Sequence, residues 1–149
     1  MPGAPRRTEP MTHPIATAAD WKNAPLPARH VALKLDFWLD AVDSACVRRG
    51  LIPLEMEDKW FLYCAGNTLY LHRSWTGLCI ARVHFVPDGE GLRAVSAEVN
   101  RDPEQYAGTD DAADVALIEG MVRGLGASQQ YRAARLAREH GWLTITPPE

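Results

Sequence analysis

The sequence has few cysteines, no long hydrophobic run and no excess of positive charge, and each of these absences excludes a class of protein. Its three cysteines, Cys46, Cys64 and Cys79, are odd in number and lack the close paired spacings of metal sites and disulfide frameworks. No apolar run approaches the roughly 20 residues that cross a bilayer, and the N-terminus lacks the apolar segment of a signal peptide. We therefore expect a cytoplasmic protein with reduced thiols, no bound metal and no membrane partner.

Charge and length limit the kinds of partner and the number of domains. The 16 basic and 19 acidic residues are spread along the chain, and the formal net charge is -3. Without a basic stripe, binding to nucleic acid is not expected. The 149 residues, 46% of them hydrophobic, are enough for one domain with a sizeable core.

The first 49 residues divide into a leader and a periodic apolar segment. Residues 1–27 are rich in Pro, Ala and Thr and show no sustained period, which predicts a flexible leader before a single domain over 28–149. Between residues 30 and 49, hydrophobic residues recur at helical spacing, and Gly50 follows as a typical helix end. The pattern predicts an N-terminal helix. The positions that carry it are Val31, Leu35, Trp38, Leu39, Val42 and Cys46.

The next fifty residues change to a period of two. Four runs rich in β-branched, aromatic and leucine residues are separated by short turns at 66–67, 74–77 and 88–91. Loops this short join antiparallel neighbours, so we expect a four-stranded antiparallel meander packed against the N-terminal helix. The runs are KWFLYCA, TLYLHR, LCIARVHFVP and GLRAVSAEVN.

Helical spacing returns near the C-terminus and completes an α+β fold. One helix follows a start signal at 109–111, and a second spans about 128–140. The tail 142–146 alternates weakly and predicts an edge strand or an extended segment. The polar residues of the last helix, interpreted as a solvated face, are Gln129, Gln130, Arg132 and Arg135.

Pairing extended from the three turns brings distant segments to one end of the sheet. Trp60 pairs with Arg73, Arg73 with Leu78, and Leu78 with Val99. Chemistry-bearing residues from three segments therefore meet there. They are Lys59, Trp60, Arg73, Ser74, Trp75, Thr76, Asn100 and Arg101.

The same register assigns the two faces of the sheet. A leucine and valine face, with Leu62 and Leu71, should receive the N-terminal helix. A slip of one residue in any hairpin exchanges the faces of that strand. The opposite face is expected to carry Phe61, Tyr63, Tyr70, His72, Cys79, Val83, Phe85, Ser96 and Glu98.

The cluster at the sheet end suits an anionic ligand with a flat ring. Arg73 offers a planar fork for a carboxylate or phosphate, and Lys59 and Arg101 add positive charge. Trp75 offers a stacking plane, and Asn100 an amide that orients the ligand. A nucleotide, an ADP-ribose-like molecule or an anionic part of a partner protein fits this set. In the alternative, the polar groups serve the turn itself and Arg73 pairs with an acid. The acids within reach are Glu98, Asp102 and Glu104.

An enzymatic site and a metal site are the other interpretations of these residues. His72 and Ser74 lie two apart and share a face, which permits a hydrolase or transferase with His72 as base and Glu98 as its partner. One strand separates His72 from Glu98 in the expected register, and no G-x-S-x-G motif is present. A metal site from Cys64, His72, Cys79 and His84 fails because these side chains point to opposite faces.

Four short motifs resemble a family of small, uncharacterised bacterial proteins. They are E-D-K-W-F at 57–61, H-R-S-W-T-G at 72–77, V-N-R-D-P-E-Q-Y at 99–106 and T-D-D at 109–111. The resemblance covers about residues 55–120 and implies an association with ADP-ribose- and NAD-related proteins, without an activity. Its motifs coincide with the segments that the register brings together.

The sequence is therefore compatible with three functions. The first is a binding or regulatory module that recognises an anionic ligand at the sheet end. The second is an enzyme that acts on such a ligand, with any cofactor left open. The third is an interaction subunit that buries the aromatic sheet face and Trp75 against another chain.

Overall fold

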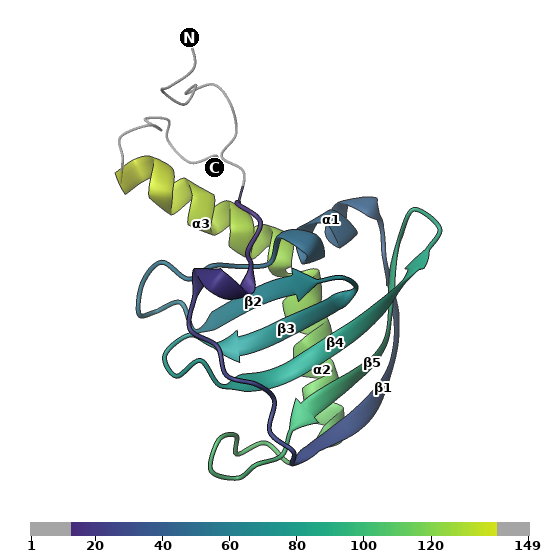
Figure 1. The fold of residues 1–149 in the computed structure, drawn as a ribbon. Coiled ribbons are helices and arrows are strands. Elements are labelled where there is room, and N and C mark those ends of the chain that lie inside the picture. The colour runs from purple at the N-terminus through teal and green to yellow at the C-terminus, as the bar shows by residue number, and fades with distance from the viewer. Residues whose placement is uncertain (1–12, 140–149) are drawn as a thin grey trace.

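The computed structural model describes residues 13–139, which form an antiparallel sheet with three α-helices on one face (Figure 1). The sheet has five strands in the order β1-β5-β4-β3-β2. The predicted α+β class and antiparallel sheet are confirmed, whereas the predicted number of four strands is wrong. In chain order the elements are the 3-10 helix η1 (Ala18–Asp20), β1 (His30–Leu39), α1 (Ala41–Arg49), β2 (Trp60–Ala65), β3 (Thr68–Arg73), β4 (Cys79–Asp88), β5 (Gly91–Asn100), α2 (Asp111–Arg123) and α3 (Leu125–Glu139).

The segment 30–49 contains the additional strand β1 and the short helix α1, instead of the one helix expected. Its hydrophobic residues fit both a helix and a strand. Leu35 and Leu39, for example, are four positions apart, which places them on one face of a helix and also on one face of a strand. Every second side chain of β1 is buried, and pairing with β5 completes the backbone ladder. Asp40 then accepts a hydrogen bond from the amide of Asp43 and begins α1.

Helix α1 ends at Arg49, followed by Gly50 as the sequence predicts. Gly50 has a φ of 70°, and a Cβ atom there would lie 2.2 Å from the carbonyl oxygen of Leu62. A glycine is needed for both reasons. Leu51 then forms a bridge with Leu62, with backbone hydrogen bonds of 2.8 and 2.9 Å, so the chain runs beside β2 before entering it.

The three hairpins follow the expected register to different extents. Strands β2 and β3 pair as predicted along their whole length. Between β3 and β4, His72 pairs with Cys79 as expected, but a bulge then places Ala81 opposite Leu71. One extra residue in one strand shifts every later pair. The sequence around the bulge contains no turn residue from which it could be predicted.

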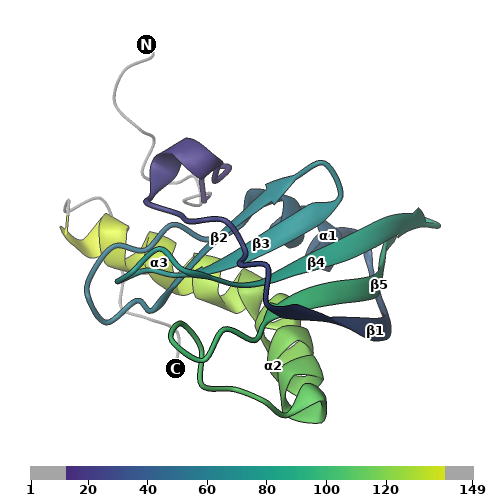
Figure 2. The ribbon, with the colours of Figure 1, turned by 60° about the horizontal axis from the view of Figure 1, so that its bottom comes forward.

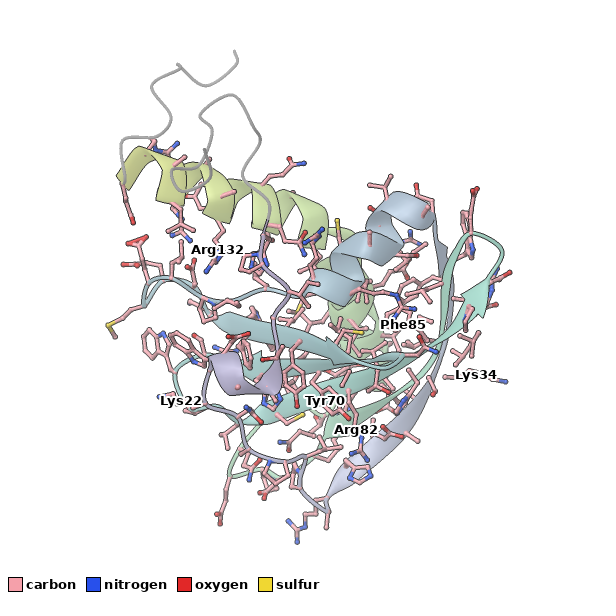
Figure 3. All side chains as sticks on the ribbon, turned by 45° about the horizontal axis from the view of Figure 1, so that its top comes forward. Lys22, Lys34, Tyr70, Arg82, Phe85 and Arg132 are labelled. Atoms are coloured by element: carbon pink, nitrogen blue, oxygen red, sulfur yellow. The ribbon has the colours of Figure 1, made fainter. Side chains whose placement is uncertain are left out.

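The β4–β5 hairpin also departs from the expected register. Its turn is tighter, with Asp88 opposite Gly91, and a second irregularity follows near His84. Val83 and Phe85 consequently lie in the core on the side of the helices, and their expected place on the aromatic face is wrong. Figure 3 shows Phe85 on the side of the helices, with Tyr70 and Arg82 on the opposite side.

The core lies between the sheet and the three helices. Strand side chains from the leucine and valine face meet Val47 of α1, Ile118 and Val122 of α2, and Leu125 of α3, all nearly inaccessible. Burying each such side chain stabilises the fold by about 1.5–3 kcal/mol. Both C-terminal helices are therefore present, although α3 begins at Leu125, earlier than expected. The tail 142–146 lies outside the described residues.

The described part of the expected leader crosses the opposite face of the sheet (Figures 1 and 2). Ala16 donates its amide to Arg49 at 2.8 Å, and Ala24 donates its amide to Gly77 at 2.8 Å. Trp21 donates its indole Nε1–H to the carbonyl of Ser74 at 2.7 Å. Residues 13–29 thus run from the end of α1, beside the edge strand β2, past the β3–β4 loop to the start of β1.

Within residues 13–139, no helix combines the length and the apolar character that crossing a bilayer requires.

Candidate functional site

Segments from three parts of the chain line a pocket at one end of the sheet. The start of β2, the β3–β4 loop and the β5–α2 connection surround a cavity of about 480 Å³. We call this cavity the sheet-end pocket. Its lining residues are Lys59, Arg73, Trp75, Thr76, Leu78, Ile80, Gln105, Tyr106, Ala107 and Gly108. Four of the eight residues expected at this end, Lys59, Arg73, Trp75 and Thr76, therefore line one cavity.

Arg73 contributes an arginine without an acidic partner to this pocket. Its guanidinium lies over the ring of Trp60, with Cζ 5.0 Å from the ring centroid. Its side chain makes no hydrogen bond or ion pair with any residue in the range 13–139. Lys59 is the second cation of the lining, and no acid lines the cavity. The expected alternative, Arg73 paired with a nearby acid, is not seen among these residues.

The loop that carries Arg73 is fixed by its own polar residues. The Ser74 side chain is buried and donates its hydroxyl to the carbonyl of Asp58 at 2.5 Å. Trp75 donates its indole N–H to the carbonyl of Met56 at 2.6 Å, although the residue is 58% exposed. Gly77 has a φ of 79°, and a Cβ atom there would lie 3.1 Å from the Lys22 carbonyl. Ser74 and Gly77 therefore position the loop and do not face a ligand.

Asn100 and Arg101 lie at the expected end of the sheet but have structural partners. Asn100 is fully buried, and its Nδ2 donates to Cys79 O and Gln105 Oε1, each at 2.9 Å. Its Oδ1 accepts from the Asp102 amide at 2.8 Å. These three bonds hold the β5–α2 connection against β4.

Arg101 is neutralised at the start of α2. Its Nη2 lies 2.8 Å from Asp111 and 2.6 Å from Asp114, whose side chain is 5% exposed. These acids hold the pKa of Arg101 above its usual value against the effect of burial. The two arginines at this end of the sheet therefore have different roles. Arg101 holds the start of α2 through its ion pairs, whereas Arg73 has no acidic partner among residues 13–139.

Tyr106 and Gln105 line the pocket and were not identified from the sequence. The Tyr106 hydroxyl donates to Asp114 at 2.6 Å. Burial and this carboxylate raise the pKa of Tyr106 to about 12, so the phenol stays protonated. Both residues belong to the motif at 99–106, but a polar connection after a strand gave no indication of which side chains turn inward.

The structure does not bring the candidate catalytic residues together. His72 is buried and stacks on Tyr63, with ring centroids 5.7 Å apart, and its Nδ1 donates to the carbonyl of Gly77 at 2.9 Å. Burial lowers the pKa of His72, and its Nε2 has no hydrogen-bond partner within the described chain. Ser74 Oγ is committed to a backbone carbonyl.

Glu98 is occupied elsewhere on the sheet. Because the β4–β5 turn is tighter than expected and an irregularity follows near His84, Glu98 lies opposite Arg82 and not beside Cys79. Its carboxylate accepts from Arg82 Nε at 2.8 Å and from His84 Nε2 at 2.6 Å. Burial opposes ionisation, but these two donors keep the pKa of Glu98 below its usual range. Glu98 is therefore part of an ion-pair group and does not orient His72.

No group of three or more His, Cys, Asp or Glu side chains in residues 13–139 is arranged to hold a metal ion. The three cysteines are free thiols. Burial raises the pKa of all three, that of Cys79 to about 11, so each is protonated at neutral pH.

The polar face expected on α3 is partly buried: the prediction that it is solvated is wrong for Gln129 and Arg132, whereas Gln130 is exposed as predicted. Gln129 donates from Nε2 to the carbonyls of Cys46 and Gly50, both at 2.8 Å. Arg132 is 8% exposed. Gln129, Ala133 and Ala137 recur at four-residue spacing, so the small alanines marked the inner side of the helix.

No protein-family model, curated protein sequence or solved structure matches this chain. The family resemblance of the short motifs consequently remains a prediction.

Proposed function

We propose that the protein is a small binding module whose sheet-end pocket takes an anionic ligand with a flat ring, of the nucleotide or ADP-ribose kind. The observation that carries this proposal is Arg73, a guanidinium with no acidic partner among residues 13–139, at a cavity lined by two cations and no acid. Elsewhere in the described chain, Arg82, Arg93 and Arg101 each pair with a carboxylate.

The geometry around Arg73 supports recognition of a phosphate or carboxylate. Stacking on Trp60 holds the plane of the guanidinium and contributes about 0.5–1 kcal/mol at an exposed site. Its edge N–H groups stay available, and they match two oxygens of an anion in a bidentate arrangement. Lys59 adds a second positive charge on the same cavity. A diphosphate or a phosphate with a nearby carboxylate suits this pair.

Aromatic surfaces support a ligand that also carries a ring. Trp75 is exposed, yet its N–H bond to the Met56 carbonyl restrains the indole, and Tyr106 lines the same cavity. Restrained aromatic side chains lose little entropy when a ring stacks on them. The volume of about 480 Å³ lies within the range of roughly 300–1,000 Å³ typical of small-molecule sites.

The two alternatives have less support. A hydrolase or transferase with His72 as base needs contact between His72, Ser74 and Glu98, and each of these side chains has another partner. An interaction subunit needs an exposed aromatic face, whereas Phe61 and His72 are 0% and 1% exposed. Binding through the pocket does not depend on either arrangement.

The test is a calorimetric titration of the full chain with ADP-ribose. Adenosine, which has the ring without phosphate, and ribose 5-phosphate, which has phosphate without the ring, separate the two parts of recognition. We expect ADP-ribose to bind more tightly than either. At about 100 times the dissociation constant, ADP-ribose should stabilise the fold by about 2.7 kcal/mol.

Substitution of Arg73 decides whether the pocket is responsible. Arg73→Met keeps an unbranched side chain next to Trp60 and removes the charge, and should weaken ADP-ribose binding by about tenfold or more, as loss of a charge-assisted hydrogen bond does. The control is Arg48→Met, an exposed arginine whose guanidinium lies against Gly66 and Asn67 at the opposite end of the sheet. The proposal fails if none of the anionic probes binds, or if Arg73→Met binds as the wild type does.

A further inference from the structure

A second cavity lies between α3 and the chain that leads into β2. Its volume is about 490 Å³, and we call it the α3 pocket. Ile52, Pro53 and Trp60 form one wall, and Ala127, Tyr131 and Arg132 of α3 form the other. Lys59 lines this cavity as well as the sheet-end pocket. The walls are largely apolar, so the few charged side chains among them determine which ligand charge the pocket accepts.

Arg132 brings an uncompensated positive charge to the α3 pocket. It extends from α3 toward the chain preceding β2 (Figure 3), where its Nε donates to the carbonyl of Ile52 at 2.6 Å. The residue is 8% exposed. Its two terminal nitrogens have no hydrogen-bond partner among residues 13–139, and no carboxylate oxygen in that range lies within 4.0 Å of them.

Two acids near this pocket, Glu55 and Asp58, are already paired with another arginine, and Glu57 of the lining makes no ion pair with Arg132. Arg135, one turn further along α3, contacts Glu55 and Asp58, each at 2.7 Å, and lies over the ring of Tyr131 at 4.8 Å. Burial and the neighbouring charge of Arg135 lower the pKa of Arg132, although an arginine remains charged at neutral pH. Arg135 therefore has its counter-ions, whereas Arg132 has none within the described part of the chain.

A buried charge without a counter-ion costs far more than a paired one, unless solvent or a ligand supplies the missing partner. We infer that the α3 pocket is a second binding site, for a small carboxylate with an aromatic or aliphatic body, and that Arg132 binds the carboxylate. The single free guanidinium edge matches two oxygens. Glu57 and Asp58 at the same cavity disfavour a more highly charged anion such as a phosphate.

The apolar walls define the rest of the ligand. Trp60 and Tyr131 offer aromatic surfaces, and Ile52 and Pro53 offer aliphatic ones. Tyr131 is 62% exposed. A ring or a short chain attached to the carboxylate covers these surfaces and gains the free energy of removing them from water. This site uses a different arginine from the sheet-end pocket, and it does not depend on the function proposed for that pocket.

The test compares two probes of the same shape and different charge. 4-Phenylbutyrate and 4-phenylbutanol are titrated into the full chain by calorimetry at pH 7. We expect the carboxylate to bind about tenfold more tightly than the alcohol, because one charge-assisted hydrogen-bond pair distinguishes them. Equal affinity of the two probes, or binding of neither, overturns the inference.

Two variants locate the binding. Arg132→Met should remove the preference for the carboxylate, while Arg138→Met, at an exposed position of the same helix, should keep it. Arg132→Met also loses the bond to Ile52, so a second variant guards against unfolding. Ala127→Phe starts from an exposed position of α3 and fills the cavity with Arg132 intact, and it should abolish binding of both probes. Unchanged phenylbutyrate binding in Ala127→Phe overturns the inference.

Cross-titration separates this site from the sheet-end pocket. Arg73→Met should bind phenylbutyrate as the wild type does, and Arg132→Met should bind ADP-ribose as the wild type does. If ADP-ribose fails to bind anywhere while phenylbutyrate follows Arg132, the proposed function is wrong and this inference stands. If phenylbutyrate binding is instead lost in Arg73→Met, the inference is wrong.

Discussion

The two ends of the sheet use arginine differently. At the end with the β2–β3 and β4–β5 turns, Arg93 meets Asp36 at 2.8 Å and Asp88 at 2.7 Å. At the opposite end, Arg73 has no acidic partner in residues 13–139 and faces a cavity. At the first end, the charge of Arg93 is satisfied by carboxylates of the protein itself. The second has connections long enough to enclose a pocket, and its unpaired charge is what indicates a ligand.

The same contrast applies to asparagine at the two ends, and it gives the largest expected effect. Asn100→Ala removes three hydrogen bonds of a fully buried side chain and leaves a buried carbonyl and amide without partners. We expect the free energy of unfolding, measured in urea, to fall by about 3 kcal/mol.

The matched control is Asn67→Ala at the turn end, where the exposed side chain accepts one bond from Arg48. Its effect should stay below about 1 kcal/mol. Similar losses for the two asparagines would show that the site end is not organised by Asn100.

A second comparison is within the site end, between Arg101 and Arg73. Arg101→Met leaves the buried carboxylate of Asp114 with the Tyr106 hydroxyl alone, and should destabilise the fold by about 2 kcal/mol. Arg73→Met loses at most the attraction to the Trp60 ring, about 0.5–1 kcal/mol. Urea unfolding of both variants checks the order, and a larger loss in Arg73→Met contradicts the division into a structural and a ligand-facing arginine.

The smallest expected effect concerns pH and His72. Burial lowers the pKa of His72 below its ordinary value of 6.5, so the folded state prefers the neutral ring. This contribution to stability is fully present above pH 6.5 and is lost as the pH falls through the lower, folded-state value. Wild-type protein should therefore be less stable at pH 5.5 than at pH 7.5.

His72→Phe keeps an aromatic ring among Phe61, Tyr63 and Tyr70 and removes the titrating group. The decrease between the two pH values, measured by urea unfolding, should become smaller without vanishing, because burial also lowers the pKa of His13. An unchanged decrease would mean that His72 does not titrate in this range.

Local sequence patterns predicted the strands β2 to β5 and the end of α1. They did not predict strand β1 or the register shifts, because these depend on pairing with segments that are distant in sequence. The hydrophobic pattern of segment 31–39 fits both a helix and a strand. The segment becomes a strand because it pairs with β5, which is distant in sequence. Bulges after Leu71 and near His84 carry no turn residue, so the faces of Val83 and Phe85 could not be read from alternation.

The candidate site was predictable to the extent that turns determine it. The loop 73–76 and the start of β2 follow directly from short hairpins, which places Lys59 and Arg73 together. Which polar side chains are consumed internally was not predictable, because the partners of Ser74 and Asn100 are backbone groups of other segments. Arg132 was missed for a related reason, since a long polar side chain in a helix rich in polar residues and alanine resembles part of a solvated helix face.

The pairing of β1 with β5 has a consequence for the order in which the protein folds. The three hairpins close over short loops, whereas pairing of β1 with β5 closes a loop that contains β2, β3 and β4. Closing such a long loop costs conformational entropy before its contacts form, so we expect β1 to pair after the meander. The same return brings residues 21–24 onto the loop that bears Arg73. We therefore expect the contacts of residues 21–24 with this loop to form later in folding than the hairpins themselves.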